Sequence, residues 1–412
     1  MKHVLFIAYH FPPLAGGGTF RSLKFVKYLP QFGWLPTVVT TNTRNYWAYD
    51  KSLLDEIPKE VKIIRASEFD PFYLQILLSK VGLGKLYQKI KNQFFIPDEK
   101  IGWIPIAYRK AVKEIKKQKY DLIFSTSPTP SAHIIALNLK KRFGIPWIAD
   151  YRDHWTLNPD YQESRKRIQK ESGIEKHLHH YASHIILNTY GNKSDIVHTY
   201  DIVNPNKISV IPNGYEDFLT DQQPIKSNKM RLIYTGTLYG RRDPFNFLEG
   251  LSILKRELPS IPIEIIFIGK SEWDINECAN KFNISNMVEY IPFLNINKVN
   301  QQIYNSDVLL LLIDTTTQSP HVIPSKLYDY LSFYRPIFAI IHDGDSKNII
   351  LKSNLGFFAN PYSVENIKNQ LLRIYNLWKS NKLHVEPNFN YIRQFHRRNL
   401  TQQLAEIFNS HL

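Results

Sequence analysis

The stretch VLLLLIDTTTQSPHVIPSKLYDYL, residues 308–331, runs from an uninterrupted aliphatic segment into an amphipathic helix. The length of the aliphatic segment, Val308 to Ile313, fits a buried strand. The helix begins with Ser325 and Lys326, where free backbone N–H groups and a lysine favour an anion such as phosphate. Asp329 lies one turn further and suits a ribose diol. The stretch therefore predicts a site for a nucleotide, held by its diphosphate and its sugar, and the alternative is a Ser-capped helix with a solvated lysine.

Short apolar strands alternate with helical segments along the rest of the chain. The predicted strands are residues 4–9, 37–41, 62–66, 121–125, 147–151, 184–188 and 208–211, and then 231–234, 264–268, 288–291, 308–313, 337–341 and 356–358. Alternating strands and helices imply parallel sheets with helices on both faces. Two such series predict an α/β protein of two doubly wound domains.

A polar linker with Pro224, residues 216–229, separates the two series. We therefore expect a first domain over residues 1–215 and a second over 230–389, with a last helix within 390–412 that packs back on the first domain. A length of 412 residues suits two domains. The composition, 43% hydrophobic and 22% charged, is typical of soluble globular proteins.

Several kinds of protein are not supported by the sequence. No apolar run approaches the ~18 residues of a membrane-spanning helix, and the apolar start of the chain is interrupted at His10 and Pro12, unlike a signal peptide. The single Cys278 cannot form an internal disulfide. No His/Cys cluster has zinc spacing. These features predict a cytoplasmic protein without a metal site.

The net charge of +15 is concentrated in one segment. Between residues 71 and 119, eleven Lys or Arg stand against three Asp or Glu, and aromatic and aliphatic residues are interleaved with them. Such a composition is typical of a segment that lies on an anionic membrane surface. We therefore predict a peripheral protein on the inner face of the cell membrane, and the alternative is a solvated basic face. Nucleic acid is disfavoured as a partner, because no nucleic-acid-binding motif accompanies the charge.

Two loops of the first domain carry candidate site residues. Gly17 and Gly18 precede a helix that follows the first strand, and they permit close approach of a donor to the backbone. The pattern is not the G-x-G-x-x-G of nicotinamide cofactors, and a plain flexible turn is the alternative. Asn213 lies in a turn that closes the last strand of this domain, where we expect it to contact the donor.

Charged residues crowd the end of the strand 147–151. Asp150 is followed by Arg152, Asp153 and His154, and unpaired charge there is costly unless it faces a cleft. Arg152 is predicted to bind a phosphate or a sugar hydroxyl, and Asp153 to accept the proton of an acceptor. The alternative is a structural Arg–Asp pair.

The loop YTGTLYGRRDP, residues 234–244, follows the first strand of the second domain. Gly236 and Gly240 loosen its backbone. Arg241 and Arg242 offer fork-shaped donors that suit a diphosphate. This placement predicts a second contribution to the donor site.

These segments, in this order, resemble the GT-B fold glycosyltransferases, and most of all the retaining enzymes of glycosyltransferase family 4 that build bacterial surface polysaccharides. The segments that carry the resemblance are YHFPPLAGGGTFRSLKFVKYLPQFGWLPTVVT, IPDEKIGW, STSPTPSAHIIALNLKKRFGIPWIADYRDHW, VIPNGYE, YTGTLYGRRDP and IPSKLYDYL. The resemblance implies two Rossmann-like domains that face each other across a cleft. It also implies a nucleotide sugar bound mainly by the second domain, a lipid-linked or glycan acceptor bound by the first, and transfer with retention.

Several family positions are occupied differently. The paired glutamates of the family fall on His321 and Asp329, and its arginine and lysine fall on Thr237 and Arg242. Asp329 can still hold ribose hydroxyls, whereas an imidazole at His321 cannot replace a carboxylate near the sugar. The family histidine falls roughly on Arg152.

The chemistry of such a transfer requires no metal and no other cofactor, because cationic side chains can stabilise the leaving diphosphate. Two alternatives share the predicted architecture. A sugar-nucleotide 2-epimerase would need no acceptor and no membrane surface. A non-catalytic partner protein with a degenerate donor site would explain the changes at His321 and Thr237.

Overall fold

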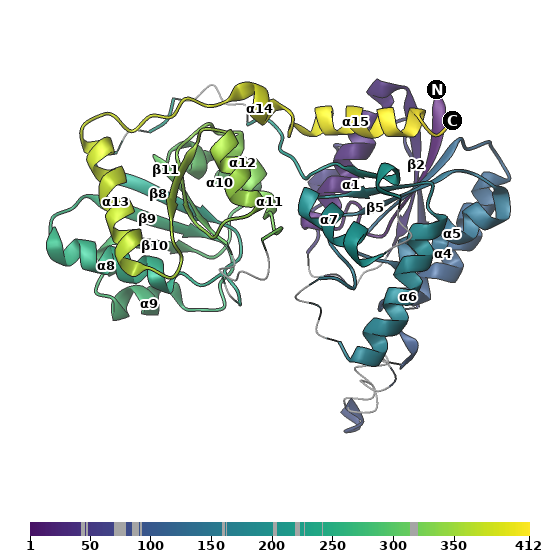
Figure 1. Ribbon diagram of the computed structural model, residues 1–412, viewed down its shortest axis with the longest axis horizontal. Helices are drawn as coiled ribbons and strands as arrows, with labels where there is room; N and C mark the ends of the chain where they lie inside the picture. Colours follow the sequence, from purple (N-terminus) through teal and green to yellow (C-terminus); the bar gives the residue numbers. More distant parts are fainter. Residues whose placement is uncertain are drawn as a thin grey trace. The chain divides into compact units, whose positions relative to one another are not determined.

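The structure is a computed structural model of the chain. It describes residues 1–42, 46, 48–69, 80–84, 90, 93–158, 161, 163–200, 204–218, 223–225, 227–240, 242–313 and 320–412. The chain forms two compact units: Met1–Asn213 together with Arg397–Leu412, and Gly214–His396. Each unit is a parallel sheet covered by helices (Figure 1).

The first unit contains a seven-stranded sheet in the order β3-β2-β1-β4-β5-β6-β7. Its strands are β1 (Lys2–Ala8), β2 (Trp34–Thr41), β3 (Lys62–Ala66), β4 (Leu122–Thr126), β5 (Trp147–Tyr151), β6 (His184–Leu187) and β7 (Ile208–Val210). Its helices are α1 (Gly17–Tyr28), α4 (Ile104–Ile115), α5 (Ser131–Phe143), α6 (Arg165–Tyr181), α7 (Tyr190–Thr199) and α15 (Arg397–Asn409). The strand order reverses between β1 and β4.

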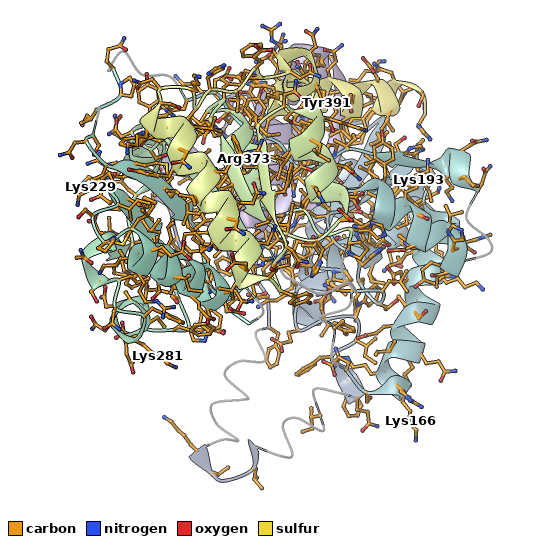
Figure 2. All side chains as sticks on the ribbon, turned by 60° about the vertical axis from the view of Figure 1, so that its left-hand side comes forward. Lys166, Lys193, Lys229, Lys281, Arg373 and Tyr391 are labelled. Carbon is orange, nitrogen blue, oxygen red and sulfur yellow. The ribbon has the colours of Figure 1, made fainter. Side chains whose placement is uncertain are left out.

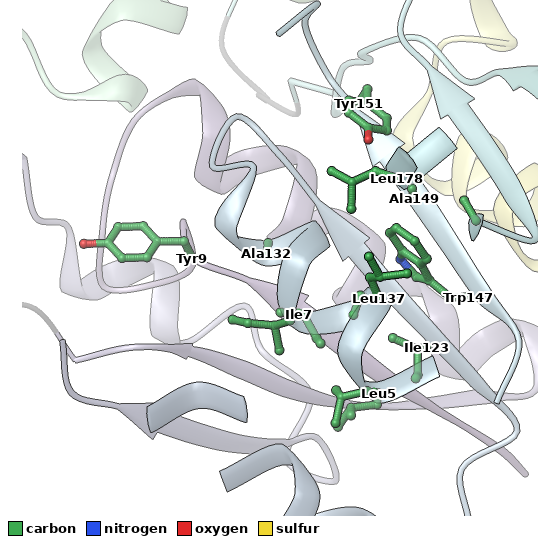
Figure 3. Packing of buried hydrophobic residues seen from close by; sticks show 14 of the residues in the cluster. Leu5, Ile7, Tyr9, Ile123, Ala132, Leu137, Trp147, Ala149, Tyr151 and Leu178 are labelled. Carbon is green, nitrogen blue, oxygen red and sulfur yellow. The ribbon is translucent and has the colours of Figure 1, made fainter. Parts of the chain in front are cut away.

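Alternate residues of β1 build two separate cores. Leu5 and Ile7 pack with α4, α5 and α6 on one face of the sheet, in the cluster that Figure 3 shows. Val4 and Phe6 pack on the other face with α1 and α15. Because successive side chains of a strand point to opposite faces, one apolar strand joins both layers.

The C-terminal helix α15 completes the second of these cores. Phe408 lies against the rings of Trp34 and Phe124, with centroid distances of 5.1 and 5.5 Å. The preceding residues 390–396 do not join the first unit as expected. Ile392 and Phe395 are buried in a core of the second unit instead.

The second unit contains a six-stranded sheet in the order β10-β9-β8-β11-β12-β13. Its strands are β8 (Met230–Thr235), β9 (Ile263–Ile268), β10 (Val288–Ile291), β11 (Val308–Leu312), β12 (Ile337–Ile340) and β13 (Gly356–Ala359). Its helices are α8 (Phe245–Glu257), α9 (Ile275–Lys281), α10 (Ile296–Tyr304), α11 (Ser325–Leu331), α12 (Asp345–Lys352), α13 (Val364–Lys379) and α14 (Phe389–Arg393).

Strand β11 is buried on both faces, as its aliphatic run predicts. Leu310 and Leu312 pack with α8 and α13, whereas Leu309 and Leu311 pack with α11 and α12. The prediction of two doubly wound α/β units is thus confirmed. In this sheet the strand order reverses between β8 and β11.

The described part of the chain contains no helix with the length and apolar character needed to cross a membrane. The basic segment 71–119 is described only in part. Lys85, Lys89 and Lys91 lie outside the described residues, and so does most of the apolar part of the segment.

Candidate functional site

The carboxyl ends of β8 and β11 define the candidate site of the second unit. Ligands of open α/β sheets bind beyond the carboxyl ends of strands, where the strand order reverses. Here that position is shared by the loop after Thr235 and by the segment that leads from β11 into α11. Both loops were singled out from the sequence, and the structure shows that they leave adjacent strands.

Gly236 and Lys326 meet at this position. Gly236 has a φ of +108°, and a Cβ on it would lie 3.2 Å from both Cε and Nζ of Lys326. Nζ lies 3.5 Å from the ring centroid of Tyr234 at the end of β8. The glycine is thus needed both for its backbone conformation and for the approach of the lysine.

The ammonium group of Lys326 is buried without a hydrogen-bond partner among the described residues, although the residue as a whole is partly exposed. Burial, and secondarily the charge of Arg242, lowers the pKa of Lys326 well below 10.5. A buried cation without a counter-ion is costly unless the site receives an anion. The role of Lys326 in binding an anion stays a prediction, and these two observations support it.

Tyr330 fixes helix α11 to both strands. Its hydroxyl oxygen accepts a hydrogen bond from the backbone N–H of Thr235 at 2.9 Å, and the hydroxyl donates to the carbonyl of Leu310 at 3.3 Å. This contact positions the first turn of α11, and with it Lys326. Tyr330 was not singled out from the sequence, because no feature of the neighbouring residues indicates that its hydroxyl reaches two strands.

Arg242 follows Gly236 on the loop after β8. Its guanidinium carbon lies 5.0 Å from the ring centroid of Tyr239, and its charge acts on Lys326. Two of the three cations that were expected to bind a diphosphate, Lys326 and Arg242, are therefore close enough to interact. The prediction for Arg241 lies outside the described residues.

Ser325 and Asp329 are both exposed on α11. The alternative of a Ser-capped helix is wrong, because Pro324 occupies the N-cap position and no side chain caps the helix. The role of Asp329 in binding ribose stays a prediction.

His321 is brought beside a carboxylate that the sequence analysis did not single out. Its Nδ1 lies 3.3 Å from Oδ2 of Asp345, the first residue of α12. The two residues are 24 positions apart, so only the fold places them together.

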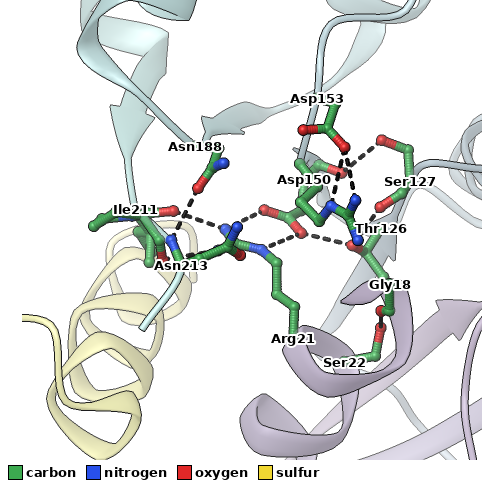
Figure 4. A network of polar contacts seen from close by, with 12 residues as sticks. Gly18, Arg21, Ser22, Thr126, Ser127, Asp150, Asp153, Asn188, Ile211 and Asn213 are labelled. Carbon is green, nitrogen blue, oxygen red and sulfur yellow. Dashed lines mark hydrogen bonds and ion pairs between the residues drawn. The ribbon is translucent and has the colours of Figure 1, made fainter. Parts of the chain in front are cut away.

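In the first unit, a buried ion pair organises the end of β5 (Figure 4). Arg21 Nε donates to Oδ2 of Asp150 at 3.0 Å, and its NH2 group donates to Oδ1 at 2.7 Å. Thr126 Oγ1 donates to Oδ2 of Asp150 at 2.6 Å. The remaining Arg21 donors bond to the carbonyls of Pro212 and Ile211, both at 2.9 Å. Asp150 is therefore a paired structural residue and does not present an unpaired charge to a cleft.

The backbone of Asn213, next to Pro212, is also fixed by a hydrogen bond. Its backbone N–H donates to Oδ1 of Asn188 at 2.8 Å (Figure 4). Together with the Arg21 contact to Pro212, this fixes the turn after β7. Contact of Asn213 with the donor stays a prediction.

Gly17 and Gly18 lie at the start of α1, under the guanidinium of Arg152. A Cβ at Gly17 would lie 3.4 Å from NH1 of Arg152, and one at Gly18 would lie 3.3 Å from the ring of His10. The structure thus brings together the two glycines and Arg152, which were singled out separately from the sequence, and adds His10. His10 follows the first strand directly, and this position was the available signal for it.

His10 is a neutral imidazole at neutral pH. Burial, followed by the charges of Arg152 and Lys100, lowers the pKa of His10 from 6.5 to about 4. Its Nε2 lies 3.2 Å from Oγ1 of Thr129. Its Nδ1 is buried without a hydrogen-bond partner in the described part of the chain.

Arg152 and Asp153 form the pair that the sequence left as an alternative. Arg152 Nε donates to Oδ2 of Asp153 at 3.0 Å, and the Asp153 side chain stays 47% exposed. The exposed carboxylate remains accessible to an acceptor hydroxyl, so its role as a base stays a prediction. His154 is turned to Asp195, with Nε2 at 3.1 Å from Oδ2.

Within the described ranges, no group of three or more His, Cys, Asp or Glu side chains is arranged to hold a metal ion. The arrangement instead offers cations for an anion in the second unit. In the first unit it offers the carboxylate of Asp153 and the neutral imidazole of His10.

Comparison with known proteins agrees with this geometry. A family model described as Glycosyltransferase Family 4 matches residues 15–219. No curated protein sequence matches the chain.

Solved structures match over the whole chain. A glycosyltransferase from Rickettsia africae is 13% identical with a TM-score of 0.67, and the match covers 100% of this chain and 98% of that one. The Anabaena protein HepE, in complex with UDP-glucose, is 14% identical with a TM-score of 0.65 and full coverage of both chains, 100% and 100%. Sucrose-phosphate synthase from Thermosynechococcus elongatus is 13% identical with a TM-score of 0.64, covering 100% of this chain and 99% of that one.

At these identities the structural similarity shows the fold, which is the two-domain GT-B fold. Together with the family match, it identifies the chain as a glycosyltransferase. More particularly, it is a GT-B glycosyltransferase that resembles glycosyltransferase family 4.

Proposed function

We propose that the protein transfers a sugar from a nucleotide-sugar donor to a lipid-linked or other glycan acceptor in the synthesis of a cell-surface polysaccharide, with retention of anomeric configuration. The observation that supports the donor site is the buried ammonium of Lys326, which has no hydrogen-bond partner among the described residues and feels the charge of Arg242, where the strand order of the second unit reverses. A nucleoside diphosphate supplies negative charge that such cations can bind.

The proposed reaction breaks the bond between the anomeric carbon and the oxygen of the β-phosphate. The electron pair stays on the diphosphate, where Lys326 and Arg242 stabilise the developing charge. The acceptor oxygen forms the new bond to the anomeric carbon on the same face, and its proton passes to Asp153. The proposal involves no metal and no other cofactor.

The identity of the donor is tested by thermal shift against UDP-, GDP-, ADP- and CMP-sugars. A ligand that binds the folded state raises the melting temperature by mass action. UDP-sugars are the first candidates, because UDP-glucose is bound in the HepE structure. If none of the four classes raises the melting temperature, the donor proposal is wrong.

Asp153 is expected to act in turnover and not in donor binding. Replacing Asp153 with asparagine should lower kcat by about 100-fold or more if its carboxylate takes the acceptor proton. The donor affinity should stay within about twofold of wild type. Steady-state kinetics with calorimetric donor titration separates the two effects.

Asp55→Asn is a suitable control for Asp153→Asn, because Asp55 is an exposed aspartate of the same unit. It should leave both parameters unchanged. Near-wild-type turnover of Asp153→Asn would reduce Asp153 to the structural partner of Arg152.

We further propose that the basic segment 71–119 holds the protein on the anionic inner face of the cell membrane. In the described part of this segment, helix α4 and the residues after it expose a row of cations, namely Arg109, Lys110, Lys113, Lys116, Lys117 and Lys119. Phe94, in the same segment, is 62% exposed. Lysines near an anionic surface contribute about 1 kcal/mol each, so several of them suffice for association.

Reversing four of these charges should release the protein from anionic vesicles. The variant replaces Arg109, Lys113, Lys116 and Lys117 with glutamate. We expect the wild type to sediment with anionic vesicles and not with zwitterionic ones. The fraction that sediments should fall as salt is added. The variant should stay in the supernatant.

The control reverses four exposed lysines of the second unit: Lys281, Lys352, Lys379 and Lys382. It changes the net charge equally, and Lys281 is seen to project outward in Figure 2. Control and wild type should sediment alike. If the α4 variant sediments with them, the basic segment is a solvated face.

A further inference from the structure

Residues 320–322, shortly before helix α11, are fastened to the start of α12. The backbone N–H of Asp345 donates to the carbonyl of Pro320 at 2.9 Å, and Ser346 Oγ donates to the carbonyl of Val322 at 2.8 Å. Gly344 has a φ of +153°, and a Cβ on it would collide with the carbonyl oxygen of Pro320. These contacts fix the backbone on both sides of His321.

The side chain of His321 is oriented by a second contact to the same helix. Its Nδ1 lies 3.3 Å from Oδ2 of Asp345, and the two side chains are 36% and 24% exposed. A carboxylate oxygen only accepts hydrogen bonds, so Nδ1 carries the proton. In the neutral imidazole this leaves Nε2 as an acceptor, and among the described residues Nε2 has no hydrogen-bond partner.

We infer that Asp345 is a positioning residue, which holds His321 so that Nε2 accepts a hydrogen bond from a hydroxyl of the donor sugar. This inference rests on the proposed function. Lys326, which marks the diphosphate, lies between His321 and Asp329 along the chain. If Asp329 holds the ribose, the sugar on the other side of the diphosphate is the part that meets His321. Residue 321 has no carboxylate of its own, but the carboxylate of Asp345 contacts its imidazole.

The substitution Asp345→Asn tests this role. It keeps the size of the side chain but removes the obligatory acceptor, so the imidazole loses its fixed tautomer. We expect kcat/KM for the nucleotide sugar to fall about tenfold or more, as for loss of a charge-assisted hydrogen bond. Affinity for the free nucleoside diphosphate should stay within about twofold of wild type, because the diphosphate contacts are unchanged.

The double variant distinguishes a positioning role from a structural one. If Asp345 acts through His321, then Asp345→Asn should cause no further loss in a His321→Gln background. Asp345→Glu, which restores an acceptor, should recover part of the activity. Asp343→Asn is the matched control: Asp343 lies two residues before Asp345 and pairs with Lys347, and its substitution should have no effect.

Three results would overturn the inference: wild-type kcat/KM in Asp345→Asn, an equal loss of affinity for the free nucleoside diphosphate, or additive losses in the double variant. These differ from failure of the proposed function, which would show as absence of diphosphate binding and of transfer in the wild type itself.

Discussion

Replacement of Lys326 by methionine is expected to weaken nucleoside diphosphate binding while stabilising the protein without ligand. Loss of a charge-assisted contact should cost about 1.5–3 kcal/mol of binding free energy. Methionine fills a similar space without a buried charge, so the free energy of unfolding at pH 7 should rise by about 1–3 kcal/mol. Isothermal titration calorimetry and thermal unfolding measure the two effects.

The pH dependence of stability gives the same prediction an independent check. The pKa of Lys326 in the folded protein lies well below 10.5. The lysine in the unfolded chain keeps the ordinary pKa of 10.5. At pH values between the folded-state and the unfolded-state pKa, the unfolded chain binds more protons, so the free energy of unfolding of the wild type rises with pH. The methionine variant lacks this gain. Its advantage over wild type should therefore shrink as the pH approaches 10.5.

Lys352→Met is the matched control for Lys326→Met. Lys352 also lies over a tyrosine ring, at 5.9 Å from the centroid of Tyr391, but it is exposed. Its substitution should change stability by less than about 0.5 kcal/mol and leave diphosphate affinity unchanged. Equal diphosphate affinity in wild type and Lys326→Met would remove the proposed anion site.

Substituting Asp150 with asparagine is expected to cause the largest loss of stability. Arg21 and Asp150 are only 4% and 0% exposed, and the substitution would leave the Arg21 guanidinium buried without its counter-ion. Such a loss costs about 3–5 kcal/mol. Equilibrium unfolding in urea measures this loss, with the same dependence of the free energy of unfolding on urea concentration used for wild type and variant.

Asp153→Asn serves as the control here, because the Arg152–Asp153 pair is partly exposed and should contribute less than about 1 kcal/mol. The two aspartates lie three positions apart in the sequence, yet one substitution should impair folding and the other turnover. A loss below about 1 kcal/mol for Asp150→Asn would show that the Arg21 network does not hold the first unit together.

The sequence predicted the architecture well because its signals are local. The aliphatic run of β11 and the strands that alternate with helices require only periodicity and length. Gly236 and Lys326 were also chosen from local signals, since Gly236 directly follows β8 and Lys326 lies in the first turn of α11. That they touch depends on β8 and β11 being neighbours in the sheet, which no short segment reveals.

The remaining site residues escaped prediction because their partners are distant in the sequence. Asp150 was grouped with the charges expected to face a cleft, but it is paired with Arg21, which is 129 positions away. His321 was judged to lack a carboxylate, and Asp345 supplies one from the next helix. Tyr330 was not singled out, although its hydroxyl joins two strands.

The central claim is that the protein transfers sugar from a nucleotide donor. The most direct test is incubation of the purified protein with the donor class found by thermal shift and a lipid-linked glycan acceptor, with NMR analysis of the products. We predict that nucleoside diphosphate is released only when the acceptor is present, and that the new glycosidic bond keeps the anomeric configuration of the donor. An epimerised nucleotide sugar, or a donor that remains intact with every acceptor, would contradict the account.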